Sequence, residues 1–252
     1  MFVSLDIQNG VHYLTEKESS FSSDYIKVRD LEKRVLSDDQ VKKLPFVSKN
    51  NQYYKEWIVR QKSSQRFISY LGSKNTPQDI LDIGCGNGWF SNLLASINLK
   101  NSVCGIDINT IELEQAAKVF KAKNLQFCYG DLFQLKKEFE GKFTIITLNA
   151  CVQYFSKFKE LVEVLKLYLK PKGEIHIIDS PFYNTNEIEN AKNRTINYYT
   201  KIGVPSMSSY YHHHSLECIS DFEKLYIPSN TIISKILKRK DSPFMWLRYT
   251  TE

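Results

Sequence analysis

The spacing of apolar residues changes along this chain. Between residues 52 and 71, bulky apolar side chains recur at helical intervals, and neither proline nor glycine interrupts them. This pattern predicts an amphipathic helix that ends at Gly72. Residues 1–50 are more polar and only weakly periodic, and their charged stretch predicts one or two short surface helices.

Short apolar runs alternate with helical stretches beyond Pro77. The runs predict strands at residues 79–83, 102–107, 125–129, 143–148 and 174–179. The stretches between them predict helices at residues 89–97, 111–121 and 158–169. Because these connections are long enough to cross over the sheet, the strands should pair in parallel. We therefore expect an α/β fold with a doubly wound, mostly parallel sheet and helices on both faces.

The remaining third of the chain has a mixed pattern. It predicts helices near residues 185–201 and 216–222, separated by a polar and aromatic stretch at residues 206–214. A last apolar run at residues 243–249 predicts an edge strand.

Composition adds few constraints. The chain has 252 residues, of which 42% are hydrophobic and 25% charged, as in an ordinary globular protein. The N-terminus shows no apolar stretch long enough for a signal peptide, so we expect a cytoplasmic protein that does not bind membranes. The five cysteines form no C-x-x-C pair, and we interpret them as free core thiols.

The net charge of +6 is modest, and only residues 235–240 form a local basic cluster. A run this short is more typical of a solvated surface than of a nucleic-acid site. We therefore do not expect nucleic acid as a partner.

The first predicted strand leads into a glycine-rich turn. Residues 80–90 read I-L-D-I-G-C-G-N-G-W-F, which places Gly84, Gly86 and Gly88 between the strand and the next helix. Glycines let the chain reverse sharply and let a ligand approach the main chain, while the helix start directs free N–H groups at that ligand. Ligands of doubly wound sheets bind at this edge.

The spacing of these glycines differs from the dinucleotide pattern G-x-G-x-x-G. Preceded by Asp82, it instead resembles motif I of class I S-adenosylmethionine-dependent methyltransferases. Later segments match the family in the same order: V-C-G-I-D-I-N (103–109), F-C-Y-G-D-L-F (127–133), T-L-N-A-C-V-Q-Y-F (147–155) and L-K-P-K-G-E-I-H-I-I-D (169–179). The resemblance covers about residues 77–180. It implies a seven-stranded sheet, S-adenosylmethionine as methyl donor and S-adenosylhomocysteine as product.

The resemblance also implies cofactor contacts. Asp107 and Asp131 follow the second and third strands, where the family binds the ribose hydroxyls and the adenine amino group, and Asp82 is expected next to the methionine ammonium group. The other expected cofactor contacts are Gly84, Cys85, Gly86, Asn87, Gly88, Ile108, Leu132 and Asn149. Arg60 shares a helix face with Tyr53 and Trp57, and we expect it to reach the methionine carboxylate.

Candidate acceptor contacts follow the fourth strand and recur in the tail. The strand ends in Asn149-Ala150-Cys151-Val152 and lacks the D/N-P-P-Y/F motif common in methyltransferases of base or glutamine amino groups. Gln153 and Tyr154 come next, close to where the methyl group must lie. Tyr154 is a candidate catalytic and substrate residue, with core packing as the alternative.

The stretch S-S-Y-Y-H-H-H (208–214) is the candidate cover of the site. We expect Tyr211 and His213 to contact the acceptor, with His213 as the proton acceptor, because imidazole titrates near neutral pH. Three consecutive histidines point in different directions, and no Cys, Asp or Glu lies nearby at ligand spacing, so no metal is expected.

These features predict a helical N-terminal cap over residues 1–75. A methyltransferase domain over residues 76–252 follows, with an insertion around 183–222 that covers the site. The expected reaction is methylation of an oxygen or nitrogen of a small, partly apolar molecule. An RNA or protein acceptor, or a non-catalytic S-adenosylmethionine-binding partner subunit, remains an alternative. Both a monomer and a homodimer are compatible with the sequence.

Overall fold

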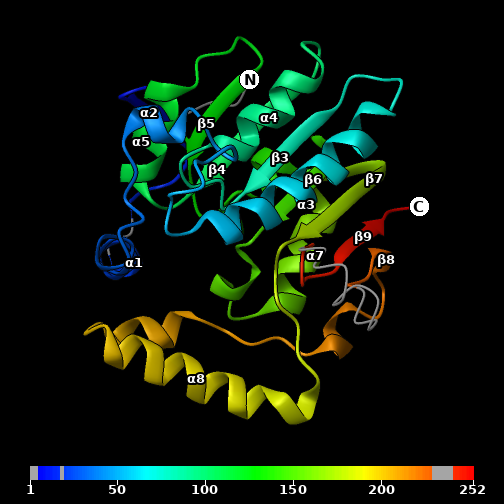
Figure 1. Ribbon diagram of the computed structural model, residues 1–252. Coiled ribbons are helices and arrows are strands. Elements are labelled where there is room, and N and C mark those ends of the chain that lie inside the picture. Colours follow the sequence, from blue (N-terminus) through cyan, green and yellow to red (C-terminus); the bar gives the residue numbers. More distant parts are fainter. Residues whose placement is uncertain (1–4, 18–19, 229–240) are drawn as a thin grey trace.

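The computed structural model describes residues 5–17, 20–228 and 241–252. Within these residues, nine strands form one sheet in the order β1-β2-β5-β4-β3-β6-β7-β9-β8 (Figure 1). The strands are β1 (Asp6–Gln8), β2 (Val11–Tyr13), β3 (Asp79–Ile83), β4 (Ser102–Asp107), β5 (Leu125–Tyr129), β6 (Phe143–Asn149), β7 (Leu169–Ile178), β8 (Glu223–Tyr226) and β9 (Trp246–Thr250).

The centre of the sheet is parallel, as predicted. Strand β3 pairs in parallel with both β4 and β6, and the parallel pairing continues to β5 and β7 on the two sides. The chain therefore builds outward from β3 in one direction and then returns to build in the other. This reversal of strand order next to β3 is where doubly wound sheets bind their ligands.

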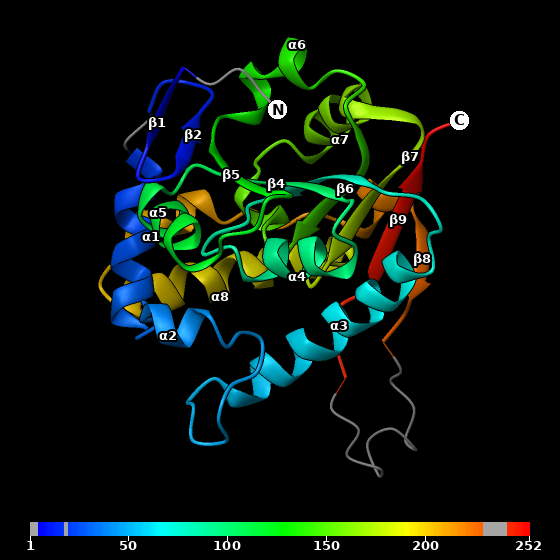
Figure 2. The same ribbon diagram turned by 90° about the horizontal axis from the view of Figure 1, so that it is seen from above.

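Helices cover both faces of the sheet, as expected. Figure 2 shows α3 (Tyr54–Gly72), α4 (Trp89–Ile97) and α5 (Thr110–Val119) on one face, with α6 (Lys136–Phe139) and α7 (Phe158–Tyr168) on the other. The predicted helix over residues 52–71 is confirmed by α3, although Gly72 is its last residue rather than a residue beyond it. Every predicted helix of the central region is present within two residues of its expected bounds.

The N-terminal region differs from the expected helical cap. Helices α1 (Ser20–Leu31) and α2 (Asp38–Val41) form as predicted, but β1 and β2 make an antiparallel hairpin, and β2 adds to the sheet beside β5. The prediction of a purely helical N-terminal cap is therefore wrong. The sheet of the described residues has nine strands, whereas seven were expected. Three-residue strands are too short for an alternating pattern to emerge from the sequence. The division at residue 75 stays a prediction.

The tail also departs from expectation in one respect. Strand β9 lies between β7 and β8 and is antiparallel to both, so it is not the predicted edge strand. The edge is β8, which the sequence did not indicate. Helix α8 (Ile188–Lys201) confirms the helix expected there, and residues 205–210 and 216–219 form 3₁₀ helices. The basic cluster of residues 235–240 lies outside the described residues.

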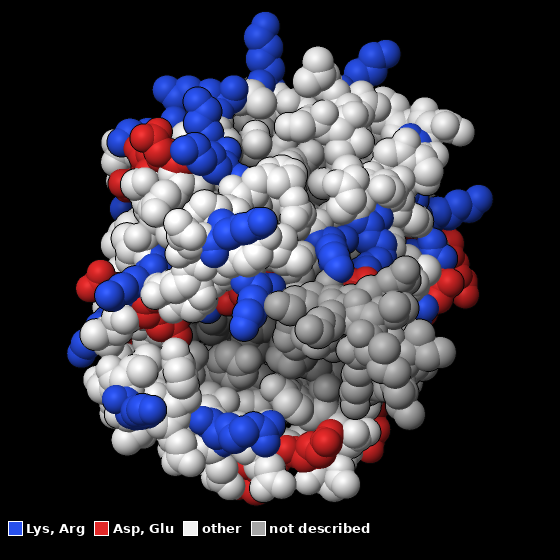
Figure 3. All heavy atoms as spheres, in the orientation of Figure 1, with Lys and Arg blue, Asp and Glu red and all other residues white. Residues whose placement is uncertain are grey.

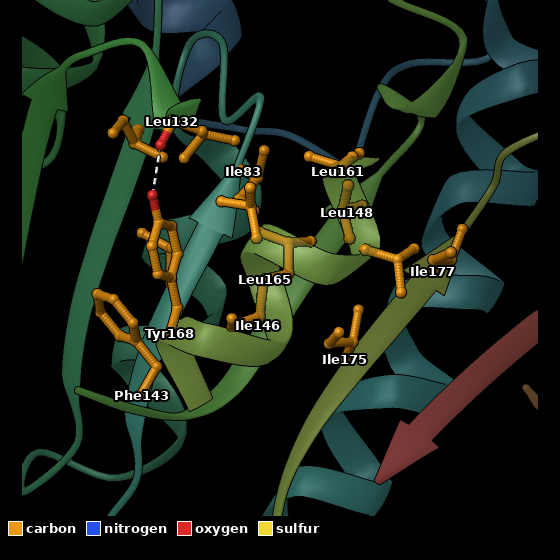
Figure 4. Close-up of a cluster of buried hydrophobic side chains, with 14 of the residues drawn as sticks. Ile83, Leu132, Phe143, Ile146, Leu148, Leu161, Leu165, Tyr168, Ile175 and Ile177 are labelled. Carbon is orange, nitrogen blue, oxygen red and sulfur yellow. Dashed lines mark hydrogen bonds between the residues drawn. The ribbon is translucent and has the colours of Figure 1, made fainter. Parts of the chain in front are cut away.

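One part of the core lies between the sheet and α7. Figure 4 shows Ile146 and Leu148 of β6 packed near Leu161 and Leu165 of α7, all of them buried. The Tyr168 hydroxyl donates a hydrogen bond to the carbonyl of Leu132, next to the third strand end that we expect to bind ligand (Figure 4). Core packing thus fixes the position of one wall of the site.

Two further predictions concern the whole chain. The cysteines are free thiols, and Cys218 is the one that is only partly buried. In the described part of the chain, no helix has the length and apolarity needed to cross a membrane.

Candidate active site

The glycine turn joins β3 to α4 and has no room for side chains. Gly84 and Gly88 have φ angles of +64° and +76°, which L-residues rarely adopt. A Cβ atom on Gly84 would lie 2.6 Å from Cys151 Cβ, and one on Gly88 would lie 2.5 Å from the Phe127 ring. Glycine is therefore required at both positions by conformation and by space.

The carboxylate of Asp107 fastens this turn to the end of β4. Its Oδ2 accepts a hydrogen bond from Gly86 N at 2.8 Å, while its Oδ1 accepts from Ile108 N at 2.7 Å and Asn109 N at 2.9 Å. Burial raises the pKa of Asp107, and these three amide donors oppose that rise. The expected ribose ligand is thus also a structural part of the turn.

Asp82 lies beneath the turn and is only 1% exposed. Its carboxylate accepts hydrogen bonds from Ser91 Oγ at 2.5 Å and from Thr147 Oγ1 at 2.8 Å, which links β3 to α4 and β6. Burial raises its pKa to about 6, although both hydroxyl donors lower it. Asp82 lines neither of the two cavities described next, so its geometry fits support of the turn better than direct contact with a ligand.

A smaller cavity of about 300 Å³ opens at the ends of β3, β4 and β5. Four of the expected cofactor residues line this cavity alone, namely Asp107, Ile108, Asp131 and Leu132. Asp131 accepts hydrogen bonds from Phe133 N and Gln134 Nε2, both at 3.0 Å. These contacts make Asp131 the cap of a short 3₁₀ helix as well as part of the cavity wall.

A larger cavity of about 570 Å³ adjoins the smaller one between the sheet, α1 and α8. Figure 3 shows this face of the molecule hollowed above α8, with Lys and Arg side chains at the rim. Six of the predicted site residues line the larger cavity alone, namely Arg60, Cys85, Asn87, Asn149, Gln153 and Tyr211.

The two cavities meet at a shared set of residues. Both are lined by Tyr25, Gly84, Gly86, Ala150 and Tyr154. Tyr25 and Tyr154 pack edge to face, with ring centroids 5.6 Å apart. A ligand that occupies the smaller cavity can therefore contact one in the larger cavity only near these two rings and the glycine turn.

Three amide groups near this junction carry unused acceptors. Within the described residues, Asn87 Oδ1, Asn149 Oδ1 and Gln153 Oε1 are buried and have no hydrogen-bond partner. A buried polar atom without a partner costs free energy, so these oxygens are suited to a ligand that carries a donor such as an ammonium group.

His213 lies next to the wall of the larger cavity rather than in it. Its imidazole Nε2 lies 2.9 Å from Thr195 Oγ1, its ring packs against Tyr183 and Tyr211, and it lines neither cavity. Burial lowers its pKa, as do several neighbouring cationic groups. The role of His213 as proton acceptor stays a prediction that the geometry of the described site does not favour.

Arg60 faces the larger cavity but already has partners. Its Nη2 lies 3.0 Å from Glu56 Oε1, and its guanidinium lies over the Trp57 ring. The glycine turn lines the same cavity as Arg60. Contact between Arg60 and the methionine carboxylate of the cofactor stays a prediction.

The sequence analysis missed several residues that line the larger cavity. Tyr25 and Arg29 come from α1, Glu112 from α5, and Tyr199 from α8. Tyr25 and Arg29 are four residues apart and so lie on one face of the helix. This spacing could have identified them, but the weak periodicity of the region made the helix face hard to recognise from the sequence. Among the described residues, no group of three or more His, Cys, Asp or Glu side chains could hold a metal ion.

The fold and this site define a Rossmann-like class I methyltransferase. The family model described as a methyltransferase domain matches residues 74–237, so the chain belongs to that family. The matched region is therefore an S-adenosylmethionine-dependent methyltransferase domain, with S-adenosylmethionine as its cofactor.

Individual relatives agree with this family. A malonyl-[acyl-carrier protein] O-methyltransferase of Halalkalibacterium halodurans is 32% identical over 123 residues, which are 46% of this chain and 45% of that protein. The enzyme of the same name from Calditerrivibrio nitroreducens is 28% identical over 188 residues, which are 69% and 73% of the two chains. With most of these relatives, the match spans about half of their length or less.

A solved structure shows a similar fold. Phosphoethanolamine N-methyltransferase 2 of Haemonchus contortus, in complex with S-adenosyl-L-methionine, has a TM-score of 0.56 at 19% identity. The similarity covers 88% of this chain and 49% of that one.

Proposed function

We propose that this enzyme transfers the methyl group of S-adenosylmethionine to an oxygen or nitrogen of a small, partly apolar molecule. The observation that carries the proposal is the larger cavity, which adjoins the smaller cavity at the glycine turn. Its wall combines aromatic side chains, including Trp57, Tyr199 and Tyr211, with eight charged side chains of both signs. Such a mixed, partly enclosed surface suits a small ligand with an apolar body.

The cofactor fits the residues at the junction. Asp107 and Asp131 would hold the adenosine part in the smaller cavity, and the unpartnered oxygens of Asn87 and Asn149 would accept hydrogen bonds from the methionine ammonium group. The bound cofactor supplies a sulfonium that activates the methyl group. The protein has to align the acceptor and exclude water.

Tyr154 is proposed to position the acceptor at the transfer point. Burial raises the pKa of its phenol to about 12, so the hydroxyl keeps its proton at neutral pH. It can therefore donate a hydrogen bond but is a poor proton acceptor. Gln153 and Tyr211 are proposed as further acceptor contacts because they line the same cavity.

The named relatives support an oxygen acceptor. Two of them are O-methyltransferases of a malonyl group on acyl-carrier protein, and the chain shares about a third of its residues or fewer with each over the matched stretch. We therefore propose oxygen over nitrogen as the methylated atom, without extending the acceptor of those enzymes to this one.

Methyl labelling of a cell extract tests the proposed function. The protein is incubated with S-[methyl-³H]adenosylmethionine and an extract that is then separated into small-molecule, protein and RNA fractions. We expect the label in the small-molecule fraction, in material that enters an organic solvent. Label confined to protein or RNA would contradict the proposal, and S-adenosylhomocysteine binding without label in any fraction would indicate a non-catalytic partner subunit.

A pair of matched variants makes this experiment specific. Asp107→Asn should weaken S-adenosylhomocysteine binding by about 10-fold or more and reduce labelling, because it removes a charged hydrogen-bond acceptor. Asp79→Asn makes the same change at the far end of β3, where the carboxylate pairs with Lys170, and should leave both unchanged. Equal effects of the two variants would remove Asp107 from the site.

A further inference from the structure

Arg29 is a partly buried cation, and one of its hydrogen-bond donors has no partner among the described residues. It lies on α1 against the larger cavity, and its side chain is 20% exposed. Its one ion pair within the described part of the chain is long, with 3.4 Å between Nη2 and Glu112 Oε1. Its Nε is buried and has no hydrogen-bond partner among the described residues. An arginine in this state gains free energy when an anion completes its hydrogen bonds.

The neighbouring acids do not fill this gap. Arg34 lies 3.0 Å from Glu32 and 2.6 Å from Glu56, so both carboxylates are already paired. Glu112 lines the larger cavity as well, next to the glycine turn, where its Oε2 lies 3.1 Å from the position of a Cβ on Gly86. Among the described residues, Glu112 is thus the one carboxylate that pairs with Arg29, and the Arg29 side chain still lines the larger cavity.

Arg29 also lies beside the point where the two cavities meet. Its guanidinium carbon lies 5.9 Å from the centre of the Tyr25 ring, which packs edge to face on Tyr154. Both tyrosines line both cavities. A group bound to Arg29 thus lies close to the rings that mark the junction between acceptor and cofactor.

The described wall of the larger cavity offers four carboxylates as candidate bases, Glu32, Glu56, Glu112 and Asp179, and each is already held by an arginine or by serine hydroxyls. This described wall includes no histidine, and burial raises the pKa of Tyr25, Tyr154, Tyr199 and Tyr211, so their hydroxyls stay protonated. An acceptor that has to lose a proton during transfer is poorly served by these groups. An acceptor that arrives as an anion needs no base.

We propose that Arg29 binds the carboxylate of the methyl acceptor, so that the acceptor is a carboxylic acid and the product a methyl ester. This inference rests on the proposed function and names its substrate class. Guanidinium groups match carboxylates in shape and charge and often bind them through two parallel hydrogen bonds. In the transfer, a carboxylate oxygen forms a bond to the methyl carbon as the bond from that carbon to sulfur breaks. The electron pair of the broken bond stays on sulfur, and no proton moves.

The cofactor carries a carboxylate too, on its methionine part, and the test must separate the two sources. Calorimetry first measures S-adenosylhomocysteine binding to the wild type and to Arg29→Gln. It then measures acid binding to each protein saturated with S-adenosylhomocysteine. The probes are hexanoate and 4-phenylbutyrate, with 4-phenylbutyramide, 4-phenylbutan-1-ol and 4-phenylbutylamine as shape-matched neutral and cationic counterparts.

Two further variants serve as controls. Arg66→Gln makes the same substitution on α3, at an arginine that is 25% exposed, ion-paired with Asp241 and not part of the wall of either cavity. Arg29→Lys keeps the positive charge but not the planar fork, so it should retain part of the affinity for acids. Circular dichroism and thermal melting establish that each variant folds.

The proposal predicts that an acid binds the wild type and that the amide, alcohol and amine bind much more weakly. Arg29→Gln should weaken acid binding by about 10- to 100-fold, the scale of hydrogen bonds to a charged group, and leave S-adenosylhomocysteine affinity within about 2-fold. Arg66→Gln should change neither affinity.

Three results would overturn the proposal. One is binding of the amide or amine as tight as that of the acids, or no binding by either acid. Another is unchanged acid affinity in folded Arg29→Gln. The third is a loss of S-adenosylhomocysteine affinity in Arg29→Gln as large as the loss for acids, which assigns Arg29 to the cofactor carboxylate. The labelling experiment is independent of these outcomes, because label in protein or RNA alone refutes the proposed function itself.

Discussion

At the scale of single residues, the site is built from carboxylates whose surroundings differ. Asp107 is held by three backbone amides and forms part of a cavity wall, whereas Asp82 is held by two hydroxyls and lines neither of the two described cavities. Motif spacing identified both residues, because it depends on neighbours in sequence. Their different surroundings could not be read from spacing, because Thr147, one partner of Asp82, is 65 residues away.

The buried Asp82 predicts a specific pH dependence of stability. Its pKa is about 6 in the folded protein, against an ordinary value of 3.8, so the folded state binds the proton more tightly. Its contribution therefore favours folding at low pH and is lost as pH rises from about 4 to 6. Asp82→Asn removes this titration. The free energy of unfolding of Asp82→Asn minus that of the wild type should rise by about 2 to 3 kcal/mol between pH 4 and pH 7.

Urea denaturation at pH 4, 5, 6 and 7 measures that difference directly. A difference between the two proteins that stays constant with pH would show that Asp82 does not titrate in this range. The absolute stability of each protein changes with other groups as well, and the subtraction removes them.

At the scale of elements, the parallel centre of the sheet was predictable and its additions were not. Strands β3, β4 and β5 have the bounds that their apolar runs predicted, because a strand buried on both faces reads as a continuous apolar segment. The short hairpin of β1 and β2 forms by adding to β5, so its formation depends on contacts far away in sequence. Local pattern carries little information about such an element.

This hairpin supports the site through β5, whose end carries Gly130 and Asp131. Tyr13 is 4% exposed and packs on Tyr129, with ring centroids 5.3 Å apart. Tyr13→Ala should lower the free energy of unfolding by about 3 to 5 kcal/mol, the usual cost of truncating a buried aromatic side chain. Ile7→Ala in the same hairpin is the control, since Ile7 is 56% exposed, and should change stability by less than about 0.5 kcal/mol.

Urea denaturation of both hairpin variants decides this prediction. Similar small effects of Tyr13→Ala and Ile7→Ala would mean that the hairpin is not packed as described. A selective loss at Tyr13, with weaker S-adenosylhomocysteine binding, would connect the hairpin to the cofactor cavity.

At the scale of the whole molecule, the larger cavity joins segments that are distant in sequence. Its wall takes residues from α1, the glycine turn, the end of β6 and α8. The glycine turn and the strand ends could be predicted, because each lies within one motif. The place of Arg29 in the site could not be predicted, because its ion-pair partner Glu112 is 83 residues away and on another helix. The sequence placed His213 at the site, and the fold places it against Thr195 in the wall of the larger cavity, so its role stays a prediction.

A crystal structure of the complex with S-adenosylhomocysteine tests the central claim most directly, which is that methyl transfer takes place where the two cavities meet. We predict adenosine in the smaller cavity within hydrogen-bond distance of Asp107, and the sulfur beside Tyr25 and Tyr154, facing the larger cavity. The larger cavity should stay open to an acceptor, with Arg29 at its wall. Adenosine bound elsewhere, or a sulfur directed away from the larger cavity, would contradict this account.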